Sequence, residues 1–208
     1  MKKQGLTSVI DYFEPDLFGS ESFFEDRLFE RIVFSGQILE KIEFYNCTFS
    51  SCDFTKVQLS RCEFEKCSFS SSDLSLLNFG GSGLADVKFI KSKLVGIIWE
   101  SVRKPCHFSF DGCKLDNSSF YGQNMKNLVM KNCSAREVDF THADLSKANF
   151  SGTDLLNSRF TETNLGFADF SSAFNYGIDP SINKIKKAIF SYPEVTSLLN
   201  YFDITIKD

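Results

Sequence analysis

One group of cysteines has the spacing C-x4-C-x9-C-x4-C, which could hold a zinc ion: Cys47, Cys52, Cys62 and Cys67. The same residues obey a simpler rule, since each lies two positions before a member of a regular apolar series, as Cys113 and Cys133 also do. A cysteine in such a place acts as a small hydrophobic side chain. The sequence therefore favours packed thiols, with only Cys106 outside the series, and predicts no metal ion and no cofactor.

Two short motifs resemble catalytic or phosphate-binding sequences only in part. Cys106 and His107 are a nucleophile and a base by type, but adjacent side chains rarely face one another, and no acid–base group accompanies either His107 or His142. The stretch Gly80-Gly81-Ser82-Gly83 lacks the Lys-Ser/Thr pair that completes a phosphate loop. The sequence therefore predicts that the protein is not an enzyme.

A repeat of five residues sets the positions of all these side chains. From Phe24 to Trp99 every fifth residue is apolar, for sixteen consecutive positions; after a slip of one residue the series resumes at Phe110 and runs to Phe170. The series holds most of the 24 phenylalanines, and the residues between its members are mostly Ser, Asn, Asp, Lys, Glu and Gly. A period of five fits neither a helix nor a continuous strand. It indicates a short extended piece and a turn, repeated, so that the chain winds around an apolar interior.

The repeat unit resembles the pentapeptide-repeat family, whose pattern is a small residue, Asp or Asn, Leu or Phe, and two polar residues. Three stretches fit it closely: Ala143-Asp144-Leu145-Ser146-Lys147, Ala148-Asn149-Phe150-Ser151-Gly152 and Ala168-Asp169-Phe170-Ser171-Ser172. The resemblance implies an all-β fold, a right-handed quadrilateral β-helix with four pentapeptides in each coil, followed here by a short C-terminal helix and strand. One face should then stack a nearly pure aromatic column that includes Phe29, Phe49, Phe69, Phe89 and Phe110.

The ends of the series and its single slip divide the chain into five parts. We expect an N-terminal cap, a first repeat block, a break or small loop, a second repeat block and a C-terminal capping and dimerisation module: residues 1–23, 24–99, 100–109, 110–170 and 171–208. A cap is needed because an open coil end exposes unpaired backbone groups. The break could serve recognition through its exposed charges, Arg103 and Lys104, or it could be a scar of insertion.

The C-terminal module contains more apolar side chains than a cap alone needs. Tyr192 to Leu199 reads as a short helix with Pro193 in its first turn, and Phe202 to Ile206 alternates like a strand. The module either caps the last coil only or also joins two copies of the chain. For the second alternative the sequence predicts a homodimer interface made by Leu198, Leu199, Phe202, Ile204 and Ile206.

The charge balance is mildly acidic, with a formal net charge of −4. This balance disfavours direct nucleic-acid binding, and the lack of a long apolar run or a leader-like start favours a cytoplasmic protein without a membrane segment. Many acids fall at the outward position just before a large residue: Asp53, Asp73, Asp139, Asp144, Asp154 and Asp169. Such residues could form an acidic, DNA-like face that binds a partner, or simply a well-hydrated surface.

Within the pentapeptide-repeat family the chain is similar to the proteins of the Qnr and albicidin-resistance type that protect type II topoisomerases. The similar stretches are Leu94-Val95-Gly96-Ile97-Ile98-Trp99, Asn117-Ser118-Ser119-Phe120-Tyr121-Gly122 and the ending from Ile178 to Asn200. This resemblance implies a dimer that binds DNA gyrase or topoisomerase IV by DNA mimicry and protects it from quinolone or albicidin-type antibiotics. The alternative is a generic interaction rod with another partner.

Overall fold

The computed structural model describes residues 8–10 and 22–205. The described residues form short strands and two short 3-10 helices: β1 (Ser8–Ile10), β2 (Phe23–Glu25), β3 (Arg27–Glu30), β4 (Ile38–Glu40), β5 (Glu43–Tyr45), β6 (Thr48–Ser50), β7 (Gln58–Ser60), β8 (Glu63–Glu65), β9 (Ser68–Ser70), β10 (Gly83–Ala85), β11 (Val87–Ile90), η1 (Trp99–Ser101), β12 (Phe108–Asp111), β13 (Val129–Lys131), β14 (Asp169–Phe170), β15 (Ile189–Phe190) and η2 (Glu194–Tyr201). Of the expected N-terminal cap, residues 1–7 and 11–21 lie outside the described part.

Each pentapeptide makes one side of a square coil. The apolar residue at the centre of the repeat points inward and is buried, as Phe44 and Phe49 are. Two residues further on the backbone takes a left-handed conformation, with φ of 51° at Asn46 and 55° at Ser51, and this turns the chain by one corner. A left-handed non-glycine residue costs about 1 kcal/mol. The cost is offset because its N–H donates to the next coil, as Ser51 N–H does to the Ser70 carbonyl at 2.9 Å. The fold is therefore the expected all-β, right-handed quadrilateral β-helix.

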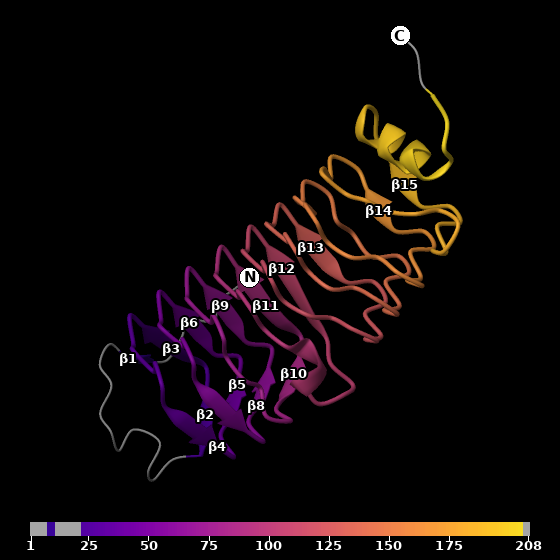
Figure 1. Ribbon diagram of the computed structural model, residues 1–208. Coiled ribbons are helices and arrows are strands. Elements are labelled where there is room, and N and C mark those ends of the chain that lie inside the picture. Colours follow the sequence, from indigo (N-terminus) through magenta and orange to yellow (C-terminus); the bar gives the residue numbers. More distant parts are fainter. Residues whose placement is uncertain (1–7, 11–21, 206–208) are drawn as a thin grey trace, which may run out of the picture. The chain divides into compact units, whose positions relative to one another are not determined.

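The chain divides into two compact units, Met1–Ile97 with Ser101–Cys113, and Ile98–Glu100 with Lys114–Asp208. In the first unit the parallel strands follow the orders β1-β3-β6-β9-β11-β12, β2-β5-β8-β10 and β4-β7. A fourth ladder of single bridges joins Val33, Asp53, Asp73 and Lys93. Partners in successive coils are 20 residues apart, as Phe44 and Phe64 are, and Figure 1 shows β3, β6, β9 and β11 side by side.

Stacked phenylalanine rings fill the interior of the first unit. The ring centroids of Phe29 and Phe49 lie 4.8 Å apart, those of Phe49 and Phe69 4.7 Å, and those of Phe89 and Phe110 5.3 Å, all nearly parallel. Rings on neighbouring sides meet edge to face, as Phe54 does with Phe49 and Phe69, so these two columns interlock. The predicted aromatic column is confirmed in this unit.

The slip in the repeat is one additional residue within a single coil. Gly83 pairs with Arg103, 20 residues later, whereas Val87 pairs with Phe108, 21 residues later. The additional residue therefore lies between Arg103 and Phe108. The register is restored before Phe110, which pairs with Phe89 as the sequence predicts.

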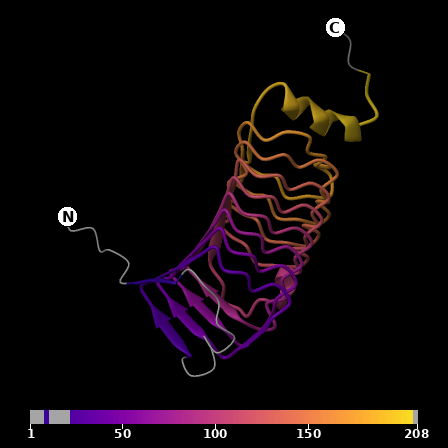
Figure 2. The ribbon, with the colours of Figure 1, turned by 90° about the vertical axis from the view of Figure 1, so that its left-hand side faces the viewer.

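The second unit has the same square section, held mostly by single bridges rather than longer strands. One ladder joins Ile98, Ser119, Asp139 and Arg159, and the others repeat the 20-residue spacing. Trp99 stacks on Phe120 at 5.3 Å, and β14 pairs with β15. η2 lies across the coils at the C-terminal end of this unit (Figure 2).

The C-terminal segment confirms the predicted helix and corrects the predicted strand. η2 covers Glu194–Tyr201, with Pro193 at its N-cap. Phe202 and Asp203 form a turn, with φ of 50° at Asp203, and Ile204 and Thr205 have no regular structure; Ile206 lies outside the described residues. Alternation of apolar residues gives a segment two faces, but a strand also needs a neighbour to pair with. The C-terminal strand of the described chain is instead β15, which precedes η2.

Candidate partner-binding surface

The cysteines that could have held a metal are packed inside the coils. The six cysteines of the repeat series are buried, and Cys106 is half-buried. The Sγ of Cys62 donates to the Leu39 carbonyl at 3.3 Å. Burial raises the pKa of the Cys52 thiol to about 11 and also raises the pKa of Cys62, because an apolar surrounding disfavours the thiolate. The predicted packing role of these thiols is confirmed, and no group of three metal-binding side chains occurs in the described residues.

The six aspartates predicted to contact a partner do not lie on one face. In the first unit Asp53 and Asp73 are neighbours on one ladder. In the second unit Asp139, Asp144 and Asp154 lie on three different ladders, and Asp169 lies on the fourth, in β14. The idea of a single acidic face is therefore corrected. The reason is the period itself: four pentapeptides complete a coil, so equal positions in successive repeats point to four different sides.

These aspartates have a local structural role in the turns. The Oδ1 of Asp169 accepts a hydrogen bond from the N–H of Ser171 at 2.8 Å, two residues on, and Asp53 accepts from the N–H of Thr55 at the same distance. Such bonds hold the corner of the coil. Four of the six also form ion pairs: Asp73 with Lys93, Asp139 with Arg159, Asp144 with Lys126 and Asp154 with Arg136.

Asp53 and Asp169 form no ion pair within the described part of the chain, unlike the other four. Both side chains are half-buried.

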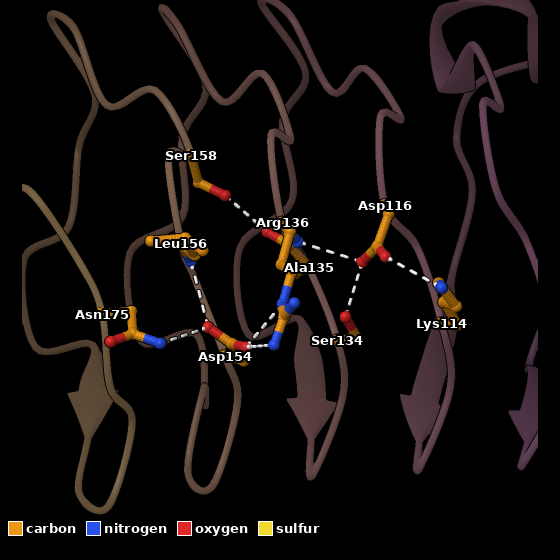
Figure 3. Close-up of polar contacts among 9 residues, drawn as sticks. All are labelled: Lys114, Asp116, Ser134, Ala135, Arg136, Asp154, Leu156, Ser158 and Asn175. Atoms are coloured by element: carbon orange, nitrogen blue, oxygen red, sulfur yellow. Dashed lines mark hydrogen bonds and ion pairs between the residues drawn. The ribbon is translucent and has the colours of Figure 1, made fainter.

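A polar network that the sequence did not reveal follows one side of the second unit (Figure 3). The Oδ2 of Asp154 accepts from the Nε and one Nη of Arg136, both at 2.7 Å, and its Oδ1 accepts from Asn175 Nδ2 at 2.9 Å. One coil before Arg136, Asp116 accepts from the Ser134 hydroxyl at 2.6 Å and from the Arg136 N–H at 3.1 Å. Only the 20-residue coil brings these residues together, because they are 18 to 21 residues apart in the chain.

The environment of Asp154 fixes its charge state. Burial by itself raises the pKa of this carboxyl, but the hydrogen bonds from Asn175 and Arg136 outweigh burial, and the pKa of Asp154 lies below its ordinary value. The same balance, with turn hydrogen bonds and a neighbouring cation against burial, lowers the pKa of Asp139 and Asp144. These groups are ionised and mostly paired, so they stabilise the coil rather than supply acid–base chemistry.

The break holds one of its two charges in an ion pair. Arg103 Nη2 lies 2.6 Å from the Oε2 of Glu63, although the two residues are 40 positions apart and belong to coils that are not adjacent. Gly83 lies between them, and a side chain there would collide with both groups. Lys104 is exposed. The local surface therefore presents Lys104 more freely than Arg103.

The residues predicted to join two copies are only partly available. Leu199, Phe202 and Ile204 are exposed, whereas Leu198 is buried within its own chain, with 9% exposed. Ile206 lies outside the described residues. Leu198 is therefore covered within its own chain and does not offer an outward contact.

The first unit also carries an open groove of about 680 Å³ beside β9, β11 and β12. Lys66, Lys88 and His107 line it together with small hydroxyl side chains. His107 Nδ1 lies 2.8 Å from the Oδ1 of Asp86, and Lys66 Nζ lies 2.7 Å from the Tyr45 hydroxyl. The groove is thus of mixed charge, and Val87, Ile90 and Phe108 add apolar surface to its lining.

Among residues 8–10 and 22–205, no helix has the length and apolar character that a membrane span requires.

Residues 22–99 and 106–175 match the family model described as the pentapeptide repeat region, and the chain belongs to that family. No curated protein sequence matches it. Among solved structures, a trypsin-treated variant of QnrB1, a plasmid-mediated fluoroquinolone resistance protein, is 16% identical, with 96% of each chain covered and a TM-score of 0.67. Full-length QnrB1 gives 16% identity, 94% and 96% coverage, and a TM-score of 0.61.

A second kind of protein is similar in fold as well. HetL from the cyanobacterium Nostoc, which is involved in the regulation of heterocyst differentiation, is 13% identical, with 85% of this chain and 90% of HetL covered and a TM-score of 0.59. At these identities the likenesses show the shared fold.

Proposed function

We propose that this protein binds bacterial DNA gyrase or topoisomerase IV and protects the enzyme from inhibitors of the quinolone or albicidin type. The observation that carries the proposal is the extent of the match to QnrB1, which covers 96% of both chains. The stretches Leu94–Trp99 and Asn117–Gly122 and the ending of the chain support it from the sequence.

We further propose that the contact uses carboxylates at the turn positions, in imitation of DNA phosphates. Asp53 and Asp169 are the best candidates because neither forms an ion pair with another described residue. An Asp→Asn change at such a position keeps the fold, since Asn149 occupies an equivalent place and accepts from the Ser151 N–H at 2.9 Å in the same way. The substitution therefore removes charge without removing the turn.

The proposal also includes a homodimer formed through the C-terminal module. Leu199, Phe202 and Ile204 present exposed apolar surface there. Replacing both Leu199 and Phe202 with Asp is expected to give a monomer by light scattering. Phe23→Asp, at an exposed phenylalanine of the first unit, is the matched control. A dimeric mass for the double variant would contradict this part of the proposal.

The experiment that tests the function is a gyrase supercoiling assay with the purified protein, with and without a fluoroquinolone or albicidin. Rescue of supercoiling in the presence of drug supports protection. Asp169→Asn should weaken rescue more than Asp139→Asn does, because Arg159 already neutralises Asp139. Absence of both rescue and inhibition at large excess would contradict gyrase binding.

A second candidate function is an interaction rod for a different partner. The groove of the first unit favours it, because a surface that contains Lys66, Lys88 and His107 has no place in an imitation of DNA. If supercoiling is unaffected, the variant Lys88→Glu should lose a partner that the native protein retains in a pull-down. Equal capture by both proteins would contradict a role for the groove.

A further inference from the structure

One side of the second unit is strongly basic, although the whole chain carries a formal net charge of −4. It is the side whose ladder of single bridges joins Asn124, Asp144, Asn164 and Lys184, and we call residues 124–127, 144–147, 164–167 and 184–187 the lysine side. Five of these residues are exposed lysines: Lys126, Lys147, Lys184, Lys186 and Lys187. Asp144 is the one acidic residue among them. The net charge of the chain therefore hides a local excess of positive charge.

Most of this positive charge is not neutralised within the described chain. Lys126 Nζ lies 3.5 Å from the Oδ2 of Asp144, and the Oδ1 of Asp144 accepts a hydrogen bond from Asn164 Nδ2 at 3.1 Å. The other four lysines form no ion pair with any described residue, and all four are exposed. Like charges that share one surface repel one another, so a ligand with several negative charges is favoured there.

An exposed phenylalanine lies between these lysines. Phe167 stands at the same corner of the coil as Lys147 and Lys187, one coil from each, and its backbone is left-handed with φ of 61°. Its side chain is 50% exposed, and Lys187 Nζ lies 5.4 Å from the centroid of its ring. A left-handed backbone is unfavourable for a bulky side chain, and this ring gains little from burial. An exposed ring among cations is the arrangement on which unpaired nucleic-acid bases stack.

We propose that the lysine side binds single-stranded nucleic acid. The lysines pair with backbone phosphates, and a base stacks on the ring of Phe167. A single strand fits better than a duplex, because only an unpaired base can turn its flat face toward a protruding ring. It also fits better than an acidic protein surface, since carboxylates give the ring no partner. This inference is independent of the proposed binding to gyrase.

The test is fluorescence anisotropy of a short labelled oligothymidylate, titrated with the full-length protein at a series of salt concentrations. Saturable binding is expected. The slope of log K against log salt concentration should be about −3, because each of about four lysine–phosphate contacts contributes about −0.7. An oligoglutamate and a duplex of the same length should each bind about tenfold more weakly, since neither offers an unpaired base.

Lys147→Gln combined with Lys187→Gln removes two of the unpaired charges. This double variant should bind at least about tenfold more weakly, and its salt slope should be smaller by about 1.4. The matched control is Lys56→Gln combined with Lys91→Gln, because these lysines are also exposed and at left-handed corners, with φ of 57° and 48°, but belong to the first unit. The control should bind the oligothymidylate like the native protein.

Phe167→Asn removes the ring and keeps the corner, since Asn127 takes the same left-handed conformation with φ of 60°. It should weaken binding about tenfold and leave the salt slope unchanged. Full binding by the double lysine variant or by Phe167→Asn would overturn the proposal, as would a failure of the native protein to bind at low salt. Equal binding of the oligoglutamate would also overturn it, in favour of an acidic protein as the partner of the lysine side.

Discussion

The stacked rings of the first unit predict a large loss of stability for Phe69→Ala. Phe69 is almost fully buried, and its ring lies between Phe49, at 4.7 Å, and Phe89, at 5.3 Å. It also meets Phe54 edge to face at 5.5 Å. Removing a buried phenylalanine ring costs about 3–5 kcal/mol, and the cost depends on how far the surroundings collapse into the cavity.

Collapse around Phe69 is restricted, because the coils above and below are fixed at the strand spacing by parallel hydrogen bonds from β6 to β9 and from β9 to β11. The expected loss is therefore in the upper part of that range, about 4–5 kcal/mol. Phe69→Leu, which refills most of the volume with the other side chain common in this series, should cost only about 1–1.5 kcal/mol.

Urea unfolding followed by far-ultraviolet circular dichroism measures these differences from the midpoint and the slope. Phe23→Ala is the matched control, since this side chain is 48% exposed and its removal should cost less than about 1 kcal/mol. A loss below about 1 kcal/mol for Phe69→Ala, with an unchanged slope, would refute the argument that the column is a rigidly packed core.

Three further predictions concern the polar groups. Because the pKa of Asp154 is lower in the folded chain than in the unfolded one, its stabilisation is full above about pH 4 and is lost as pH falls through the lower folded value. Asp154→Asn should lower stability by about 2 kcal/mol at pH 7, because it weakens the charge-assisted bond from Arg136, and it should flatten the acid limb of a stability-against-pH curve; an unchanged acid limb would count against it. With Ellman's reagent the native protein should expose no more than Cys106 of its seven cysteines, and all seven in urea; rapid reaction of several native thiols would contradict their burial. Asp53→Ala should cost about 1 kcal/mol in urea unfolding, because Asp53 accepts from both the N–H and the hydroxyl of Thr55, and no loss would mean that this turn needs no side-chain bond.

The fold could be predicted because each pentapeptide has the same local pattern, an inward apolar residue followed two positions later by a corner residue. An apolar residue such as Phe49 must point inward, and a residue such as Ser51 two positions later must turn the corner, so the period alone defines the square coil. The position of the cysteines follows from the same rule. The slip before Phe110 could also be predicted, since the later series continues in one register.

What the repeat could not predict is how side chains in different coils meet. Asp154 and Arg136 are 18 residues apart, and Glu63 and Arg103 are 40 apart; these pairs depend on which residues share a side of the coil and on which rotamers reach across it. The aspartates look alike in sequence, yet three in the second unit lie on three different ladders.

The sequence by itself determined the β-helix, its inward residues and the helix near the C-terminus, because these depend on periodicity and local turn chemistry. Tertiary structure alone decided that Leu198 is buried, that Phe202 begins a turn rather than a strand, and that Glu194 of η2 and Tyr176 line the same open groove. The reason is that residues 20 positions apart become neighbours wherever the repeat continues. A segment outside the repeat is positioned only by the surface on which it packs.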